Sequence, residues 1–183
     1  MNPLERGAIV LASLALSAGL IALLSGFFTS RDQGSVSISS SVTGHRFRNL
    51  GDAVLKPGQR HPAYDSRPPT SGAHLPEPVT RDQVQLNEDQ VLQALAAGDV
   101  VIAYGGRQPP AGLTTLARAL APPFTPALAA AGQTVILERR PRTVGLIGLA
   151  WAHILRARSP TDPRLREFAA FWLGRGASRA RGL

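Results

Sequence analysis

The fold of this chain is decided by residues 87–106, Asn-Glu-Asp-Gln-Val-Leu-Gln-Ala-Leu-Ala-Ala-Gly-Asp-Val-Val-Ile-Ala-Tyr-Gly-Gly. The first part predicts a helix, because Asn87 can cap it, Gln90 takes the capping-box position and Gly98 supplies a C-terminal stop. The second part, residues 100–104, is a short apolar run with β-branched residues, which is typical of a buried strand. A helix that leads directly into a buried strand indicates a domain of mixed α and β structure.

The chain after this stretch continues to alternate between helix and strand patterns. A second helix is predicted at residues 113–120, where apolar residues recur with helical spacing. Two strands are predicted at residues 134–139 and 144–152, separated by a turn at Pro141. A last helix follows Asp162, which can cap it. The predicted fold class is a single small α/β (α+β) domain, a short mixed sheet with helices packed on it.

The region before residue 87 is irregular, and its most distinctive segment is Arg-Pro-Pro-Thr-Ser-Gly-Ala-His at residues 67–74. Two prolines stiffen the chain, and the Ser-Gly pair permits a tight turn whose amides could face an anion. The segment is therefore either a binding loop that presents His74 or a rigid surface turn in which His74 caps a carbonyl. The candidate binding-loop residues are Pro68, Pro69, Thr70, Ser71, Gly72 and His74.

Metal binding is an alternative, because His45, His61 and His74 lie in the same irregular region and imidazoles bind copper or zinc. Their spacing matches no compact ligand motif, and the chain has no Cys to add a thiolate. A hydrolytic enzyme is the weakest alternative, since Thr70 and Ser71 lack a Gly-x-Ser-x-Gly turn and no His–Asp pair can be assigned to them. We therefore predict no catalytic residue and no cofactor. A bound copper or zinc ion is the alternative to the absence of a cofactor.

Residues 7–28 predict a transmembrane helix, because these 22 residues contain no charged side chain and no Pro. A helix of that length spans about 33 Å, enough for a hydrocarbon core of about 30 Å. A cleaved signal peptide is the alternative, but its apolar core is usually only about 7–15 residues. We therefore expect a single-pass anchor that remains attached.

The predicted anchor divides the chain into five parts. Residues 1–6 form a cytoplasmic head before the anchor, and the Ser-rich residues 29–44 form a flexible linker after it. Residues 45–175 form the α/β domain, which we expect outside the cytoplasm, and residues 176–183 form a basic tail. A short head and a large following domain favour this orientation, although the two flanks carry one Arg each.

The formal net charge of +8 is concentrated at the end of the chain, where residues 139–183 carry ten arginines and only two acidic residues. Such a surface can contact anionic lipid headgroups, at about 1 kcal/mol for each basic residue, or can simply be a solvated basic face. Nucleic acid is disfavoured as a partner, because aromatic residues do not alternate with the arginines. The candidate membrane-surface residues are Arg139, Arg140, Arg142, Arg175, Arg179 and Arg181.

The block at residues 68–74 resembles the hallmark of a bacterial family known as domain of unknown function 3105, which carries Pro-Pro-Thr-Ser-Gly-Pro-His after an N-terminal membrane segment. Ala73 replaces the last Pro of that pattern. The resemblance continues through the strand at residues 100–104, Ala150-Trp151 and the final helix, and covers roughly residues 46–175. It implies the same fold for this chain.

A second family block, His-x-Leu-Glu-His-Gly, is degenerate here. Gln93, Ala96 and Ala97 stand where the family has two His and a Glu, and Val54 stands where it often has another His. A metal site cannot lose so many ligands and keep its affinity. The resemblance therefore favours a non-catalytic, membrane-anchored accessory or binding domain, whose partners are the lipid bilayer and other membrane proteins.

Overall fold

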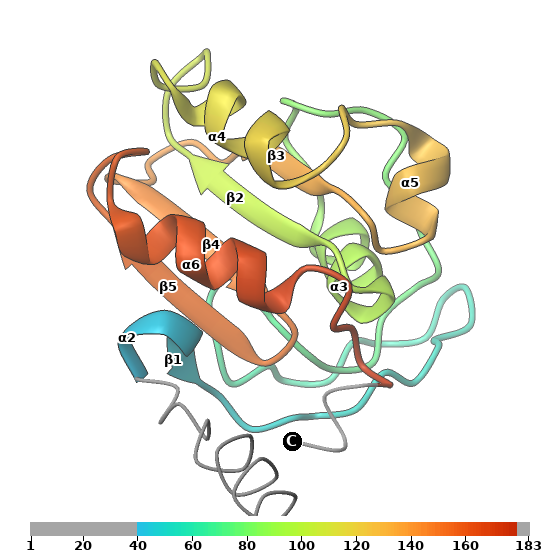
Figure 1. The fold of residues 1–183 in the computed structure, drawn as a ribbon. Coiled ribbons are helices and arrows are strands. Elements are labelled where there is room, and N and C mark those ends of the chain that lie inside the picture. The colour runs from blue at the N-terminus through green and yellow to red at the C-terminus, as the bar shows by residue number, and fades with distance from the viewer. Residues whose placement is uncertain (1–39, 179–183) are drawn as a thin grey trace, which may run out of the picture. The chain divides into compact units, whose positions relative to one another are not determined.

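The computed structural model describes residues 40–178 and is built around a mixed sheet of five strands in the order β1-β5-β4-β2-β3 (Figure 1). Strands β2 and β3 are parallel, and the other neighbouring pairs are antiparallel. The strands are β1 (His45–Arg46), β2 (Val100–Tyr104), β3 (Val135–Arg139), β4 (Leu146–Ala150) and β5 (His153–Ala157). The prediction of a small α/β domain with a short mixed sheet is confirmed.

Five helices lie among the described residues, and three of them lie where the sequence predicts a helix. The helices are α2 (Ser40–Thr43), α3 (Glu88–Ala97), α4 (Leu113–Leu120), α5 (Pro126–Ala130) and α6 (Pro163–Trp172). Helix α3 begins with a capping box in which Asn87 and Gln90 each accept a hydrogen bond from the backbone N–H of the other. It ends at Gly98, which adopts the left-handed conformation.

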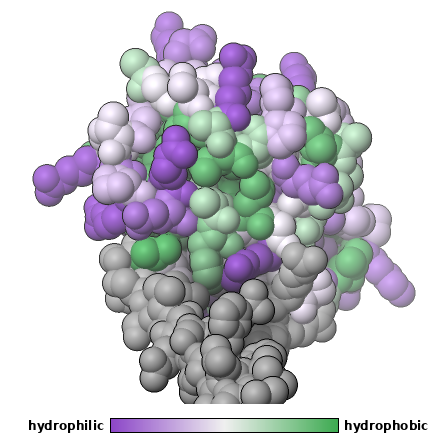
Figure 2. Space-filling view, viewed as in Figure 1, coloured by the Kyte–Doolittle hydropathy of each residue, from purple (hydrophilic) through white to green (hydrophobic). Residues whose placement is uncertain are grey.

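One face of the sheet is covered by α4 and α6, which pack against alternate residues of β2. Phe168 of α6 and Leu113 of α4 are fully buried in this layer. Figure 2 shows apolar surface in the middle of the same face, with hydrophilic residues around it. Partly buried hydrophobic residues packed against the layer are Leu120, Phe171 and Leu173.

The other face is covered by α3 and by the long irregular segment at residues 47–86. Val91 and Leu95 of α3 pack against Val101 and Ala103, the β2 residues that point away from α6. Part of the irregular segment also closes the free edge of β3, because Gln83 N–H donates to Leu137 O and Arg139 N–H donates to Val84 O. A covered edge cannot pair with another chain in the same way.

The described structure modifies several predicted boundaries. Helix α2 lies inside the predicted linker, so the ordered domain begins by Ser40. Ala177 is buried and its N–H donates to Ala96 O, so the predicted tail begins too early. The predicted strand at residues 144–152 is shorter, and a further strand, β5, follows it.

The predicted head, the predicted anchor and most of the predicted linker lie outside the described residues. Within residues 40–178, no helix is both long enough and apolar enough to cross a membrane.

Candidate functional site

The Pro-Pro-Thr-Ser-Gly block is buried inside the domain. Thr70 and Ser71 have no exposed surface, and only 2% of His74 is exposed. The backbone of the block runs beside residues 51–55, where Gly72 N–H donates to Gly51 O at 2.8 Å and His74 N–H donates to an alanine carbonyl at 3.0 Å. The block therefore forms part of the cover on the α3 face of the sheet.

The polar side chains of the block bond within the domain. The Ser71 hydroxyl accepts from Leu50 N–H and donates to Arg48 O, both at 3.1 Å. Nδ1 of His74 lies 2.9 Å from Gly72 O, and because a carbonyl can only accept, this nitrogen carries the proton. These hydrogen bonds give the polar groups of the block a structural role inside the domain. A role of the block in binding a ligand stays a prediction.

Gly72 is the residue of the block whose size is most restricted. Its φ angle is +130°, and a Cβ atom at this position would lie 2.8 Å from Cε1 of Tyr64. The Tyr64 ring is itself fixed, since its hydroxyl donates to Ala73 O at 2.8 Å. A larger residue at position 72 would therefore have to displace the Tyr64 ring, which this hydrogen bond holds in place.

Thr70 connects the block to the sheet at the turn between β4 and β5. Its carbonyl accepts from Ala152 N–H at 2.9 Å, and Phe47 N–H donates to Ala152 O at 2.8 Å. Ala152 has a φ of +59°, a conformation that residues other than Gly adopt rarely. The two hydrogen bonds therefore hold the turn in a conformation that local sequence does not favour.

The three candidate metal ligands occupy different environments. His45 is exposed on β1, where its ring meets Phe47 edge to face. Nε2 of His61 lies 2.8 Å from Oδ1 of Asp89. Among residues 40–178, no three His, Cys, Asp or Glu side chains are grouped as a metal ion would require. Copper or zinc binding through these histidines stays a prediction, which metal analysis of the purified protein would test.

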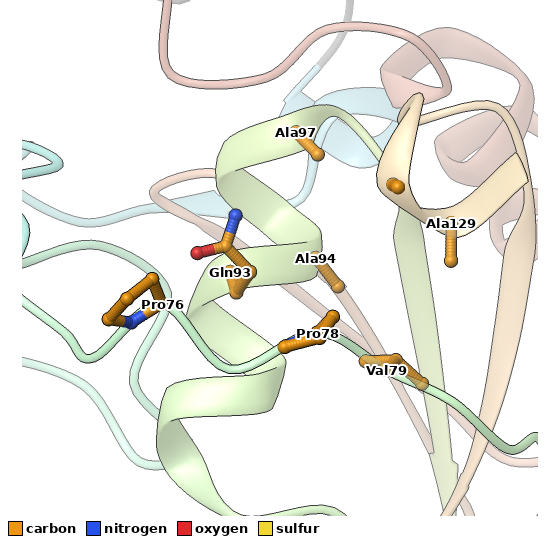
Figure 3. A pocket seen from close by; sticks show the side chains of 8 residues that line it. Pro76, Pro78, Val79, Gln93, Ala94, Ala97 and Ala129 are labelled. Atoms are coloured by element: carbon orange, nitrogen blue, oxygen red, sulfur yellow. The ribbon is translucent and has the colours of Figure 1, made fainter. Parts of the chain in front are cut away.

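An apolar groove lies on the α3 face, between α3, α5 and the proline-containing segment at residues 76–79 (Figure 3). Its volume is about 260 Å³. Gln93 has the longest polar side chain at the groove, and the remaining lining side chains are apolar and mostly small. The lining residues are Pro76, Pro78, Val79, Gln93, Ala94, Ala97, Ala129 and Ala130. We call this feature the α3 groove.

The α3 groove coincides with the segment in which the second family block is degenerate. Gln93 and Ala97 lie one turn apart and both line it, whereas Ala96 packs toward the core and accepts a hydrogen bond through its carbonyl. Close packing at the end of α3 requires glycine at position 132, because a Cβ atom there would collide with Ala97 O. Sequence reasoning missed the groove, although the run of small residues in α3 opposite two prolines was a signal for it.

The candidate lipid-binding arginines belong to two ends of the sheet. Arg139, Arg140 and Arg142 lie at the β3–β4 turn, where β5 ends and α6 is about to begin. Arg175 follows α6, whose last residue, Trp172, donates from Nε1 to Thr43 O at the opposite end. Arg179 and Arg181 lie outside the described residues. The basic residues therefore do not form one continuous surface within residues 40–178.

Two of these arginines already have partners in the domain. Nε of Arg140 lies 3.0 Å from Oε1 of Glu138, a carboxylate without exposed surface whose pKa is raised by burial and lowered in part by Arg140. The Arg175 guanidinium lies 4.0 Å from the centre of the Phe171 ring. Arg142 is exposed at the turn and is therefore better placed than Arg140 and Arg175 to contact solvent or lipid headgroups.

Asp99 is a second buried carboxyl group, located where α3 passes into β2. Its Oδ1 accepts from Thr134 N–H at 2.9 Å, while its Oδ2 and the Thr134 hydroxyl have no hydrogen-bond partner in the described structure. Burial raises the pKa of Asp99 to about 7, and the hydrogen bond from Thr134 lowers it in part. Among the described residues, its hydrogen-bond partner is a backbone N–H group, which indicates a structural role for Asp99.

The fold and these contacts define a small α/β domain with a mixed sheet, a buried Pro-Pro-Thr-Ser-Gly segment and a shallow apolar groove. A family model described as "Protein of unknown function (DUF3105)" matches residues 57–181. The chain belongs to this family. No curated protein and no solved structure matches it.

Proposed function

We propose that this protein is a single-pass, membrane-anchored binding domain that works outside the cytoplasm and performs no catalysis of its own. The uncharged segment at residues 7–28 supports the anchor. Residues 29–39 separate it from α2, and eleven residues reach at most about 40 Å when fully extended. A domain on such a tether stays close to the bilayer and meets other membrane proteins there.

The α3 groove is the observation that carries the binding role. It is lined by apolar side chains and one neutral amide, so it favours an uncharged occupant. Its volume of about 260 Å³ is below the range of about 300–1,000 Å³ that is usual for drug-sized ligands. The occupant that fits best is a short segment of a partner membrane protein that inserts one or two aliphatic side chains and hydrogen-bonds to Gln93.

The contacts of the buried hydroxyls lend no support to the alternative of a hydrolytic enzyme. The Ser71 hydroxyl bonds to backbone groups, and the Thr70 hydroxyl lies 3.1 Å from the hydroxyl of Ser66. A nucleophile would instead need a general base within hydrogen-bond reach. A binding role therefore agrees better with the geometry.

The test is co-purification of the full-length protein from mild detergent, with Ala97→Leu as the variant that fills the α3 groove. We expect a specific partner with the native protein and its loss with Ala97→Leu. Ala170→Leu is the matched control, because Ala170 is exposed on α6, on the other face of the sheet. Recovery of the same partner with both variants, or recovery of a lone monomer in every case, would contradict the proposal.

A further inference from the structure

A second cavity, of about 220 Å³, lies beyond the edge strand β3, on the face of the sheet that α4 covers. Three parts of the chain that are distant in sequence form its walls, namely residues 82–83, α4 and residues 122–124. Its floor is apolar and includes Leu137. Unlike the α3 groove, this cavity has charged groups in its walls, Asp82 and Arg118.

Asp82 is a partly buried carboxylate with no cationic partner. Its Oδ1 accepts from Leu137 N–H at 2.7 Å, and no Lys, Arg or His lies within ion-pair distance of it in the described structure. Burial raises its pKa, while hydrogen bonds from Leu137 and Gln83 lower it in part. A carboxylate in this state gains from any cation that enters the cavity.

Arg118 is the second charged group that lines the cavity, and it is exposed. It lies in the last turn of α4, a helix whose sequence contains no acidic residue. It forms no ion pair with any residue of the described range 40–178. Because Asp82 and Arg118 line one cavity without pairing with each other, a ligand located between them can meet both charges.

The backbone next to Asp82 is strained at Gln83. Gln83 has a φ of +60°, a conformation that residues other than Gly adopt rarely. It is held there by the hydrogen bond from its N–H to Leu137 O and by the Tyr104 hydroxyl, 3.4 Å from its carbonyl. Strain of this kind is concentrated at binding sites, where a side chain must be positioned before the ligand arrives.

We propose that this cavity binds a small zwitterion, an α-amino acid with an apolar side chain. Its ammonium group pairs with Asp82, its carboxylate pairs with the Arg118 guanidinium, and its side chain packs against Phe124. A ligand with only a negative charge would leave the charge of Asp82 without a partner. A ligand with only a positive charge would leave the charge of Arg118 without one. The cavity's volume of about 220 Å³ is below the range of about 300–1,000 Å³ that is usual for drug-sized ligands, which favours a small molecule.

Full-length protein in detergent would be titrated calorimetrically with L-phenylalanine and L-leucine. 3-Phenylpropanoate is phenylalanine without the ammonium group and phenethylamine is phenylalanine without the carboxylate, so these two compounds test each charge separately. We expect saturable binding of at least one amino acid and at least tenfold weaker binding of the two analogues. Arg118→Gln and Asp82→Asn should each weaken amino-acid binding by at least tenfold. Asp82→Asn keeps the acceptor for Leu137 N–H.

Arg166→Gln is the matched control, since Arg166 is exposed on α6 and does not line the cavity. It should leave binding unchanged. Absence of binding by either amino acid would overturn the proposal. So would equal binding of the amino acid and its single-charge analogues, or binding that survives both the Arg118 and the Asp82 variants.

Discussion

The two faces of the sheet are covered in different ways. On one face, α4 and α6 bury large apolar side chains such as Leu113 and Phe168, and their backbone groups bond within the helices. On the other face, one helix is joined by a long irregular segment whose backbone groups have no such internal pattern. Buried N–H and C=O groups must find partners, so this cover depends on individual hydrogen bonds from the Pro-Pro-Thr-Ser-Gly block.

The two covers should therefore fail in different ways. A helix cover depends mainly on buried volume, so removing a large side chain should have the greatest effect there. An irregular cover depends on close backbone approaches and satisfied polar groups, so adding a single methyl group should be enough to disturb it. Three variants test this comparison.

The largest effect is expected for Phe168→Ala in the helical cover. Phe168 has no exposed surface, and truncation of such a residue typically costs about 3–5 kcal/mol through lost burial and the cavity left behind. Urea unfolding of the full-length protein in detergent measures this loss. Phe171→Ala on the same helix is the control and should cost clearly less, because Phe171 is only partly buried. Equal losses for the two variants would contradict the volume argument.

Gly72→Ala should have the next largest effect, in the irregular cover. The added methyl group meets the Tyr64 ring at 2.8 Å, and the backbone has a positive φ. Overpacking and strain together predict a loss of about 2–4 kcal/mol in unfolding free energy. Gly58→Ala is a sharp control, because Gly58 has a φ of +83° but no atom within 4 Å of the added methyl group. It should lose only about 1 kcal/mol, and a similar loss in both variants would show that the ring contact is unimportant.

Asp99→Asn tests a buried polar group that, unlike Ser71, is incompletely satisfied. The pKa of Asp99 is raised to about 7 in the folded state from an ordinary value of 3.8, so folding favours the neutral acid. Its contribution to stability is fully present below about pH 4 and is lost as pH rises through about 7. At pH 8.5 the neutral amide should therefore be more stable than the native protein, by at most about 4 kcal/mol.

Thermal unfolding between pH 5 and pH 9 measures this effect. The melting temperature of the native protein should fall over this range relative to that of Asp99→Asn, which keeps an acceptor for Thr134 N–H. Asp162→Asn is the control. The pKa of Asp162 is lowered, mainly by its hydrogen bond with Arg164, so this carboxylate does not titrate between pH 5 and pH 9. Its replacement should leave the shape of the pH profile unchanged. Parallel pH profiles for the native protein and Asp99→Asn would contradict the prediction.

Local signals predicted much of the fold. Helix α3, with its capping box and Gly98 stop, strand β2 and helix α4 have the bounds that caps and periodicity indicated. Helix α5 was missed, although Thr125 followed by Pro126 is a recognisable start; Thr125 accepts from Leu128 N–H. The site was less predictable, because the most distinctive block is buried and the α3 groove is formed by residues with little character of their own.

Local sequence signals were sufficient to predict the capped helices, the buried strand, the fold class and the family membership that the Pro-Pro-Thr-Ser-Gly block suggests. The position of the turn from β4 into β5 depends on tertiary contacts, because no turn residue marks Ala152. That turn is held by Thr70 and Phe47, which lie far away along the chain. Caps and periodicity depend on neighbours within a few residues, whereas strained turns, buried loops and grooves depend on contacts that exist only after the chain has folded.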